Sequence, residues 1–266
     1  MFDDRSAIRN VSSEGVLVLG GGRALLMQVA HPSIAAGVAD HSNFRGDRIG
    51  RLLRTLEATY ALVFGTPEQA EAAARRVNAM HERVVGPGYR ALDPDLLLWV
   101  HSTLIDTSLL MYSLFVRRLS DREREAYYRD ARRMGHAYGL DDDALPRTYR
   151  DLDAYVREMV ATLVVNDTAR RIAAAIFAPE PPIVAPAMIL ARELTAELLP
   201  PSLRAQYGLH TQPMRTFALQ SAAALSRELL PYVPRPLRAP PPFVMPKGGW
   251  SRAAFRRPIA VEASVP

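Results

Sequence analysis

The sequence predicts an all-α protein, a single large helical domain of about eight to ten helices that ends in an extended C-terminal tail. Of the 266 residues, 48% are hydrophobic and 23% are charged, which suits a large buried core and argues against disorder. Apolar residues recur at intervals of three and four along most of the chain, whereas the alternation typical of strands is hardly visible. Cap-then-proline pairs, Thr66-Pro67 and Asp93-Pro94, precede two of these segments.

The expected elements follow from these signals in chain order. We expect residues 1–19 to be a surface lead-in, residues 20–232 the helical domain, and residues 233–266 a loose tail rich in proline and arginine. Gly20-Gly21-Gly22 indicates a flexible entry to a helical stretch that His31-Pro32 interrupts, because proline disfavours helix in the residue before it. Further helices are expected over residues 47–64, 67–85, 94–116, 120–138, 149–165, 167–177, 188–199 and 211–232.

The charge distribution argues against a nucleic-acid-binding face. The formal net charge is +5, and from Tyr232 onward six basic residues stand against the single acid Glu262, so the remaining body is balanced. Basic residues in the body are interleaved with acids, and no aromatic–basic stacking platform is visible. The basic tail leaves open a weak peripheral contact with an anionic membrane.

The absence of cysteine and the positions of the apolar segments limit which chemistry and which cellular compartment we expect. The chain has no cysteine, which excludes disulfides, thiolate catalysis, iron–sulfur clusters and Cys-ligated haem. The N-terminus shows no apolar segment of signal length, so we expect a cytoplasmic protein. The long apolar stretch Leu96–Val116 contains His101 and Asp106, both costly in lipid, and therefore predicts a buried helix of a soluble protein.

One helical stretch, RRVNAMHERVV at residues 75–85, places a histidine on an apolar face. Ala70, Ala74, Val77, His81 and Val84 follow one another at offsets of four, three, four and three, the spacing of one buried stripe. An imidazole in such a stripe needs a hydrogen-bond partner or a metal. The spacing alone favours a core histidine bonded to a backbone carbonyl; ligation of a haem iron is the alternative.

The other histidines complete the set of candidates. His101 lies in the most apolar helix, either as a bonded core histidine or as a second residue that lines or ligates in the same pocket. His31 is expected to bond a helix end, and His41, His136 and His210 to lie on the surface. None of the six histidines has Glu three residues before it, and neither a zincin motif nor a nucleophile elbow occurs. Haem held by a histidine remains as the redox chemistry open to a cysteine-free helical chain.

The helix expected over residues 47–64 has a second face of interest. Its apolar stripe runs from Ile49 to Val63, and Arg51, Arg54 and Thr55 lie together on the opposite side. This polar side is either a plain solvent face or the wall of a polar pocket.

Four stretches of the chain resemble one known family. LLMQVAHPSIAAGVADHSNFRGD, then RLLRT, then the Met-His pair at 80–81, then DPDLLLWVHSTL are similar to the oxygenase family of the mycophenolic-acid-pathway oxygenase and the rubber oxygenase (latex-clearing protein) catalytic domain. The resemblance extends from about Gly22 to Phe177. In latex-clearing proteins, a globin-like helical core holds a b-type haem between a proximal Arg-x-x-His-x-x-x-Arg motif and a distal Arg-x-x-Lys-Thr motif.

The resemblance assigns roles to individual residues. It implies that His81 is the proximal iron ligand, and that Arg51 and Thr55 belong to the distal motif. Arg54 stands where the family has lysine, and because a guanidinium keeps its charge it would bind a haem propionate or dioxygen and would not exchange protons. Asn78 and Val85 replace the two arginines that flank the proximal histidine.

The function that the resemblance implies is a haem b-dependent oxygenase. Dioxygen would be the co-substrate, and the substrate would be a small apolar, unsaturated molecule, terpenoid or prenyl-like. The implied catalytic residues are Arg51, Arg54 and Thr55, the implied cofactor-binding residues are these two arginines with His81 and His101, and His81 is the metal ligand. The alternative is a non-catalytic helical protein that binds haem or a lipid.

Overall fold

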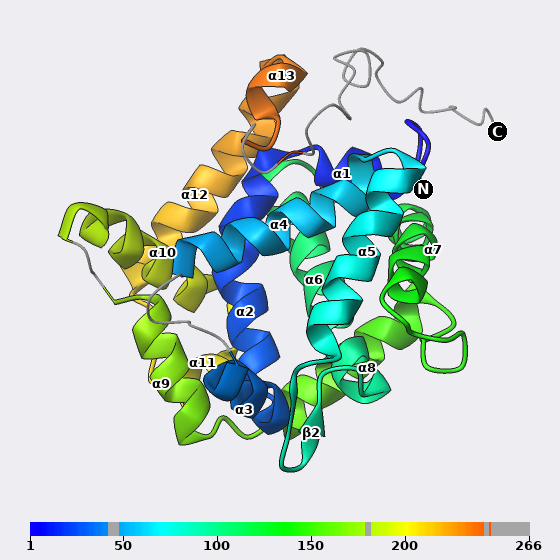
Figure 1. Ribbon diagram of the computed structural model, residues 1–266. Coiled ribbons are helices and arrows are strands. Elements are labelled where there is room, and N and C mark those ends of the chain that lie inside the picture. Colours follow the sequence, from blue (N-terminus) through cyan, green and yellow to red (C-terminus); the bar gives the residue numbers. More distant parts are fainter. Residues whose placement is uncertain (42–47, 179–181, 242–244, 246–266) are drawn as a thin grey trace.

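The all-α prediction is confirmed. The computed structural model describes residues 1–41, 48–178, 182–241 and 245, apart from the side chains at positions 48, 49, 51 and 52. Helices surround a common core, as Figure 1 shows. They are α1 (Ala7–Ser12), α2 (Gly21–Val29), α3 (Pro32–His41), α4 (Arg48–Phe64), α5 (Pro67–His81), α6 (Pro94–Phe115), α7 (Asp121–Ala137), α8 (Tyr149–Thr162), α9 (Asp167–Ile176), α10 (Ala185–Leu198), α11 (Pro201–Gln206), α12 (Pro213–Leu229) and α13 (Arg235–Arg238), with 3₁₀ turns η1 (Gly15–Gly20), η2 (Pro182–Val184) and η3 (Leu230–Tyr232).

Helix α6 passes through the centre of the molecule (Figure 1). It packs against η1, α2, α7, α8 and α12, so that apolar side chains are buried around most of its circumference. Trp99 is fully buried and its indole nitrogen donates to the Met27 carbonyl at 3.0 Å. The long apolar stretch is therefore the core helix that the sequence predicts. In the part of the chain that the structure describes, no helix has the length and apolar character needed to cross a membrane.

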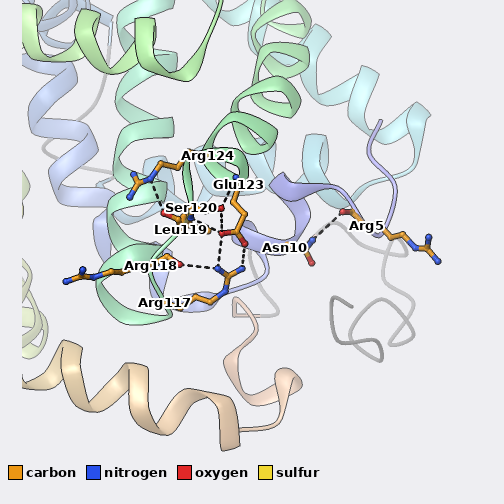
Figure 2. Close-up of polar contacts among 8 residues, drawn as sticks. All are labelled: Arg5, Asn10, Arg117, Arg118, Leu119, Ser120, Glu123 and Arg124. Carbon is orange, nitrogen blue, oxygen red and sulfur yellow. Dashed lines mark hydrogen bonds and ion pairs between the residues drawn. The ribbon is translucent and has the colours of Figure 1, made fainter. Parts of the chain in front are cut away.

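Side-chain caps define where several helices begin. Figure 2 shows the start of α7, where Ser120 and Glu123 cap each other's backbone N–H and Arg117 bonds the Glu123 carboxylate at 2.6 Å. The hydrogen bond from Arg117 lowers the pKa of Glu123 to about 2. Thr66 forms the same kind of box with Gln69 at α5, and Asp93 caps α6. The predicted caps are thus confirmed.

The N-terminal segment is not the surface lead-in that the sequence suggested. Ile8 and Val11 of α1 are buried in the core together with Phe2. The backbone N–H of Ile8 donates to Asp130 at 3.1 Å, and the Arg9 guanidinium donates to the carbonyl of Val63 at 2.8 Å. Two turns of helix are too short for a periodic signal, so the amphipathic face of α1 escaped the sequence reading.

The start of the C-terminal tail is also held, contrary to the prediction of a loose extended tail. Arg235–Arg238 form α13, and the Arg238 guanidinium lies 3.3 Å from the carboxylate of Glu14, with both side chains largely buried. A Cβ on Gly15 would lie 2.8 Å from the carbonyl oxygen of Ala239, so only glycine lets the tail pass this close. Residues 246–266 lie outside the described part of the chain.

Helix α5 ends earlier than predicted. It stops at His81, and the chain then forms a short antiparallel hairpin of β1 (Val85–Gly86) and β2 (Tyr89–Arg90). Gly88 turns this hairpin with a φ of +79°, which favours glycine. His81 is therefore the last residue of its helix, and the predicted continuation to residue 85 is wrong.

The glycine triplet permits close packing. A Cβ on Gly20 would lie 2.6 Å from a Thr107 methyl of α6, and one on Gly22 would lie 2.1 Å from the Thr195 hydroxyl of α10. Helix α2 thus approaches α6 and α10 more closely than any larger residue would allow. The glycine triplet, predicted to be a flexible entry to a helix, is therefore a site of tight packing between helices.

We expect Gly22→Ala to lower the free energy of unfolding by about 2 kcal/mol, because its methyl group overpacks against Thr195. Chemical denaturation measures this loss. The double variant Gly22→Ala/Thr195→Ala should lose less than the sum of the two single variants, since removing the hydroxyl makes room for the methyl. Strict additivity would contradict this account of the contact.

Candidate functional site

His81 lies in the apolar stripe of α5, as predicted. Ala70 and Ala74 are buried, and Val77, His81 and Val84 are partly buried. Yet the imidazole has no hydrogen-bond partner among the described residues, and its Nδ1 is buried without one. The carbonyl partner that the spacing favoured is thus not found there. Burial lowers the pKa of His81, so the ring is held neutral.

Asn78 lies one helical turn before His81 and fixes this end of α5. Its amide nitrogen donates to the carbonyl of Ala137, the last residue of α7, at 3.1 Å. Its Oδ1 is buried and has no partner. Residues three apart are neighbours on a helix surface, so two unsatisfied buried atoms, Asn78 Oδ1 and His81 Nδ1, occur on one face. Such atoms call for an explanation by a ligand, a water or a rearranged bond.

The predicted polar face of α4 is present in part. Arg54 and Thr55 are exposed on α4, each with a polar partner, and the Thr55 carbonyl accepts from the Thr59 hydroxyl at 2.9 Å. The side chain of Arg51 lies outside the described residues. No hydrogen bond links Arg54 or Thr55 to His81 in the described part of the chain.

The pairing of α4 with α5 explains where these residues lie. Only Gly65 and Thr66 join the two helices, which pack together near this turn and diverge away from it (Figure 1). Arg54 lies ~15 Å along α4 from the turn, and His81 lies ~20 Å along α5 from it. Arg54 and His81 thus each lie in the half of their helix that is farther from the turn at Gly65 and Thr66.

His101 is buried between α6 and α7. Its exposed fraction is 5%, its Nε2 has no hydrogen-bond partner, and a Cβ on Gly135 would lie 3.3 Å from this nitrogen. Burial lowers the pKa of His101 to about 4, although the backbone of Ala131 opposes the shift. This ring faces the backbone of α7, so the structure favours a core histidine here over a second iron ligand.

The remaining histidines lie where the sequence placed them. Nδ1 of His31 accepts from the Ser33 N–H at 3.3 Å, at the break between α2 and α3. His41, His136 and His210 are exposed. In the described ranges, no group of three or more His, Asp or Glu side chains is arranged to hold a metal ion.

The sequence reading missed a buried arginine. Arg23 of α2 is 6% exposed, and its guanidinium lies 2.6 Å from Asp106 and donates to Thr107 at 2.7 Å, both on α6. It also donates to the Leu198 carbonyl of α10 at 2.9 Å. Asp106, an acid within an apolar helix, indicates that a cation lies opposite it. Arg23, which stands in the apolar segment after the glycine triplet, was the candidate for that cation.

The comparison with known proteins decides the family. A family model described as "ER-bound oxygenase mpaB/B'/Rubber oxygenase, catalytic domain" matches residues 8–228. The chain belongs to this oxygenase family. The match extends from α1 to α12, so it includes His81, Arg51, Arg54 and Thr55 and confirms the resemblance seen in the sequence.

Two mycobacterial proteins are similar in sequence to most of the chain. An uncharacterized protein of Mycobacterium bovis and one of Mycobacterium tuberculosis are each 25% identical to the chain over 226 residues. These matches cover 78% of this chain and 88% of each relative.

The buried His101 predicts how the free energy of unfolding depends on pH. Below about pH 6.5 the unfolded chain protonates His101, whereas the folded chain does so only near its lowered pKa of about 4. The unfolded state therefore binds more protons in this window, and stability falls as the pH is lowered through it. We expect a loss on the order of 3 kcal/mol from this group.

Urea denaturation at a series of pH values measures this loss. His101→Gln should show a shallower fall in stability between about pH 6.5 and pH 4 than the unmodified protein. His210→Gln, at an exposed position, is the matched control and should keep the original slope. Equal slopes in all three proteins would show that His101 is not buried neutral.

Proposed function

We propose that this oxygenase-family protein binds haem b through His81 and uses dioxygen to oxidise a small apolar, unsaturated substrate of the terpenoid or prenyl type. The observation that supports the haem ligand is the imidazole of His81, which is neutral, largely desolvated and without a hydrogen-bond partner among the described residues. A neutral imidazole in a dry environment is suited to iron ligation.

The residues around His81 fit the group. Nδ1 is the fully buried ring nitrogen without a partner, so Nε2 is the nitrogen we assign to the metal. Asn78 Oδ1, which has no partner among the described residues and lies one turn earlier, is the acceptor we propose for Nδ1–H once the side chains rearrange, and this bond would fix the ring and its tautomer. Because haem would bring its own porphyrin nitrogens to the iron, a single histidine from the protein would be enough to hold it. Bound there, haem would supply the redox chemistry with dioxygen.

The polar face of α4 would serve the other side of the site. Arg54 keeps its charge at all relevant pH values, so it can hold a carboxylate such as a propionate or polarise an oxygen atom, but cannot relay a proton. Thr55, beside it, offers a hydroxyl as donor or acceptor. Arg51 completes the predicted set. His101 faces α7, and we therefore assign the ligand role to His81 alone.

The surface near His81 supports an apolar substrate. Met80, Val85 and Leu92 are exposed by 56%, 51% and 37%, and all three lie within twelve residues of the ligand histidine on α5 and the hairpin that follows. A soluble chain rarely leaves large apolar side chains in water without a use when they gather in one region. We propose that these side chains, which are close to His81 in the sequence, form an apolar approach to the site, and this would suit a hydrocarbon substrate better than a charged one.

The absorbance spectrum of the purified protein, expressed with a haem supply, tests the cofactor. We expect a Soret band in the unmodified protein and its loss, with the loss of bound haem by pyridine haemochrome assay, in His81→Ala. His210→Ala is the control and should retain both. A Soret band that is unchanged in His81→Ala would refute the ligand assignment. Haem that binds but does not react with dioxygen would instead favour a haem-binding protein without catalysis.

Arg54→Ala separates binding from turnover. We expect this variant to keep the Soret band while its turnover of an unsaturated terpenoid falls at least ~10-fold, because a charge that polarises oxygen is lost. Arg54→Lys should recover part of the rate, since the positive charge returns without the guanidinium geometry. Oxygen consumption and product analysis measure both. Full activity in Arg54→Ala would exclude Arg54 from the reaction.

A further inference from the structure

Among the residues that the structure describes, helix α12 contacts the body of the protein along one side only. Of its residues, Ala223 is buried. The Ser226 hydroxyl donates to the Phe115 carbonyl at 2.7 Å, and the Arg227 guanidinium donates to the Leu114 carbonyl at 2.6 Å. Near its start, Thr216 donates to Glu197 of α10 at 2.9 Å. These contacts fix the rotation of the helix about its own axis.

The opposite side of α12 carries a continuous apolar stripe. Its large members, all exposed, are Met214 (76%), Phe217 (67%), Leu225 (59%), Leu229 (52%) and, just beyond the helix, Tyr232 (85%). Small residues, Ala218 and Ser221, lie between them at helical spacing, and both are exposed. An amphipathic helix of a monomer buries its large apolar side chains, whereas α12 exposes them to water. Its small residues lie at the middle of the exposed stripe.

We propose that this stripe is a self-association surface, through which α12 packs antiparallel against α12 of a second copy about a two-fold axis near Ser221. The stripe lies on α12, whereas the proposed cofactor site lies on α4 and α5, so the inference does not depend on the proposed function.

The order of side-chain sizes fits this pairing. In an antiparallel pair centred on position 221, Leu225 of one copy faces the level of Phe217 and Ala218 of the other, and Met214 faces the level of Glu228 and Leu229. Apolar side chains thus meet apolar side chains on both sides of the axis, and the same patch is used on both copies, as in an isologous interface. Small residues at the centre allow the two helix backbones to approach closely.

The area is also sufficient. The five large side chains together expose on the order of 700 Å², close to the roughly 800 Å² per partner of a standard stable interface. The stripe holds one charged residue near its edge, Glu228, so little charge would have to be desolvated.

A membrane surface is a poorer occupant. A helix that lies on a bilayer needs lysine or arginine heads free for the lipid phosphates. The two arginines of α12 are engaged within the protein, Arg215 with Glu193 and Arg227 with the Leu114 carbonyl. A serine at the middle of the stripe also suits a helix–helix contact better than the acyl region of a lipid.

Sedimentation velocity over a range of protein concentrations tests the proposal. We expect a monomer–dimer equilibrium with a dimer populated at micromolar concentration, and at least a ~100-fold rise in Kd for Leu225→Lys, because two charges enter each interface. Val164→Lys replaces an equally exposed apolar residue elsewhere (69%) and should leave the Kd unchanged. Circular dichroism checks that both variants keep the native helix content.

Cross-linking tests the register. The chain has no cysteine, so Ser221→Cys introduces a single thiol that lies beside its own copy at the axis. We expect a disulfide-linked dimer on mild oxidation. Gln220→Cys is the matched control: it is exposed on the same helix but points about 100° away, and it should stay largely monomeric.

Three outcomes would overturn the proposal. One is a monomer at all concentrations up to ~100 μM, far above the Kd of a standard interface. Another is a dimer that forms only after residues 246–266 are deleted, which would show that the tail covers the stripe. The third is binding to phosphatidylglycerol vesicles that Leu225→Lys abolishes in a protein that stays monomeric, which would assign the stripe to a membrane.

Discussion

The ion pair between Arg23 and Asp106 is the constraint on which the centre of this fold depends. It joins α2 to the middle of α6, and through the Leu198 carbonyl it also reaches α10. A buried ion pair is not by itself a large source of stability, since desolvation offsets much of the attraction, but a broken one leaves a charge without a partner. Its main effect is to allow one arrangement of the three helices.

The glycines next to this pair serve the same arrangement. Gly20 and Gly22 let α2 lie close to α6 and α10, and this closeness brings the Arg23 guanidinium within reach of three acceptors. A larger residue at either glycine would push the helices apart and strain the charged contacts. Packing and electrostatics are therefore coupled at this point, and α6 is the helix against which η1, α1, α2, α7, α8 and α12 all pack.

The sequence was informative where a signal extends over several turns of helix. The caps of α6 and α7 and the core position of α6 follow from side-chain chemistry and periodicity, and the structure confirms them, as it does the stripe from Leu53 to Val63 on α4 and from Ala70 to His81 on α5. The side chain of Ile49 lies outside the described residues, and Val84 lies beyond the end of α5. It was uninformative where a segment is short or the partner is distant. Helix α1 has too few residues for a period, and the contact between Glu14 and Arg238 joins positions that no local pattern relates. The end of α5 was missed because Val84 and Val85 continue an apolar spacing that a hairpin turn at Gly88 interrupts.

At the candidate site, too, the sequence indicates which residue types are present but not how they are arranged in space. The sequence singled out His81, but the distinction between a bonded core histidine and a ligand depends on what lies near the ring, which spacing does not encode. One ring nitrogen of His31 and one of the exposed His136 bond to the protein, whereas Nε2 of the core residue His101 has no partner among the described residues but lies against the backbone of α7. His81 instead combines a lowered pKa with a buried Nδ1 that lacks a partner, one turn from the equally unsatisfied oxygen of Asn78. Burial causes that lowering of the pKa, so the ring is held neutral, and in the proposed site a second-shell bond would set its basicity. An amide oxygen at position 78 gives weaker support than a carboxylate would, and it adds no positive charge as the family's arginine does. In the proposed haem site, asparagine in place of that arginine would change the electrostatics beside His81, and Arg54 in place of lysine would change proton transfer on the other side.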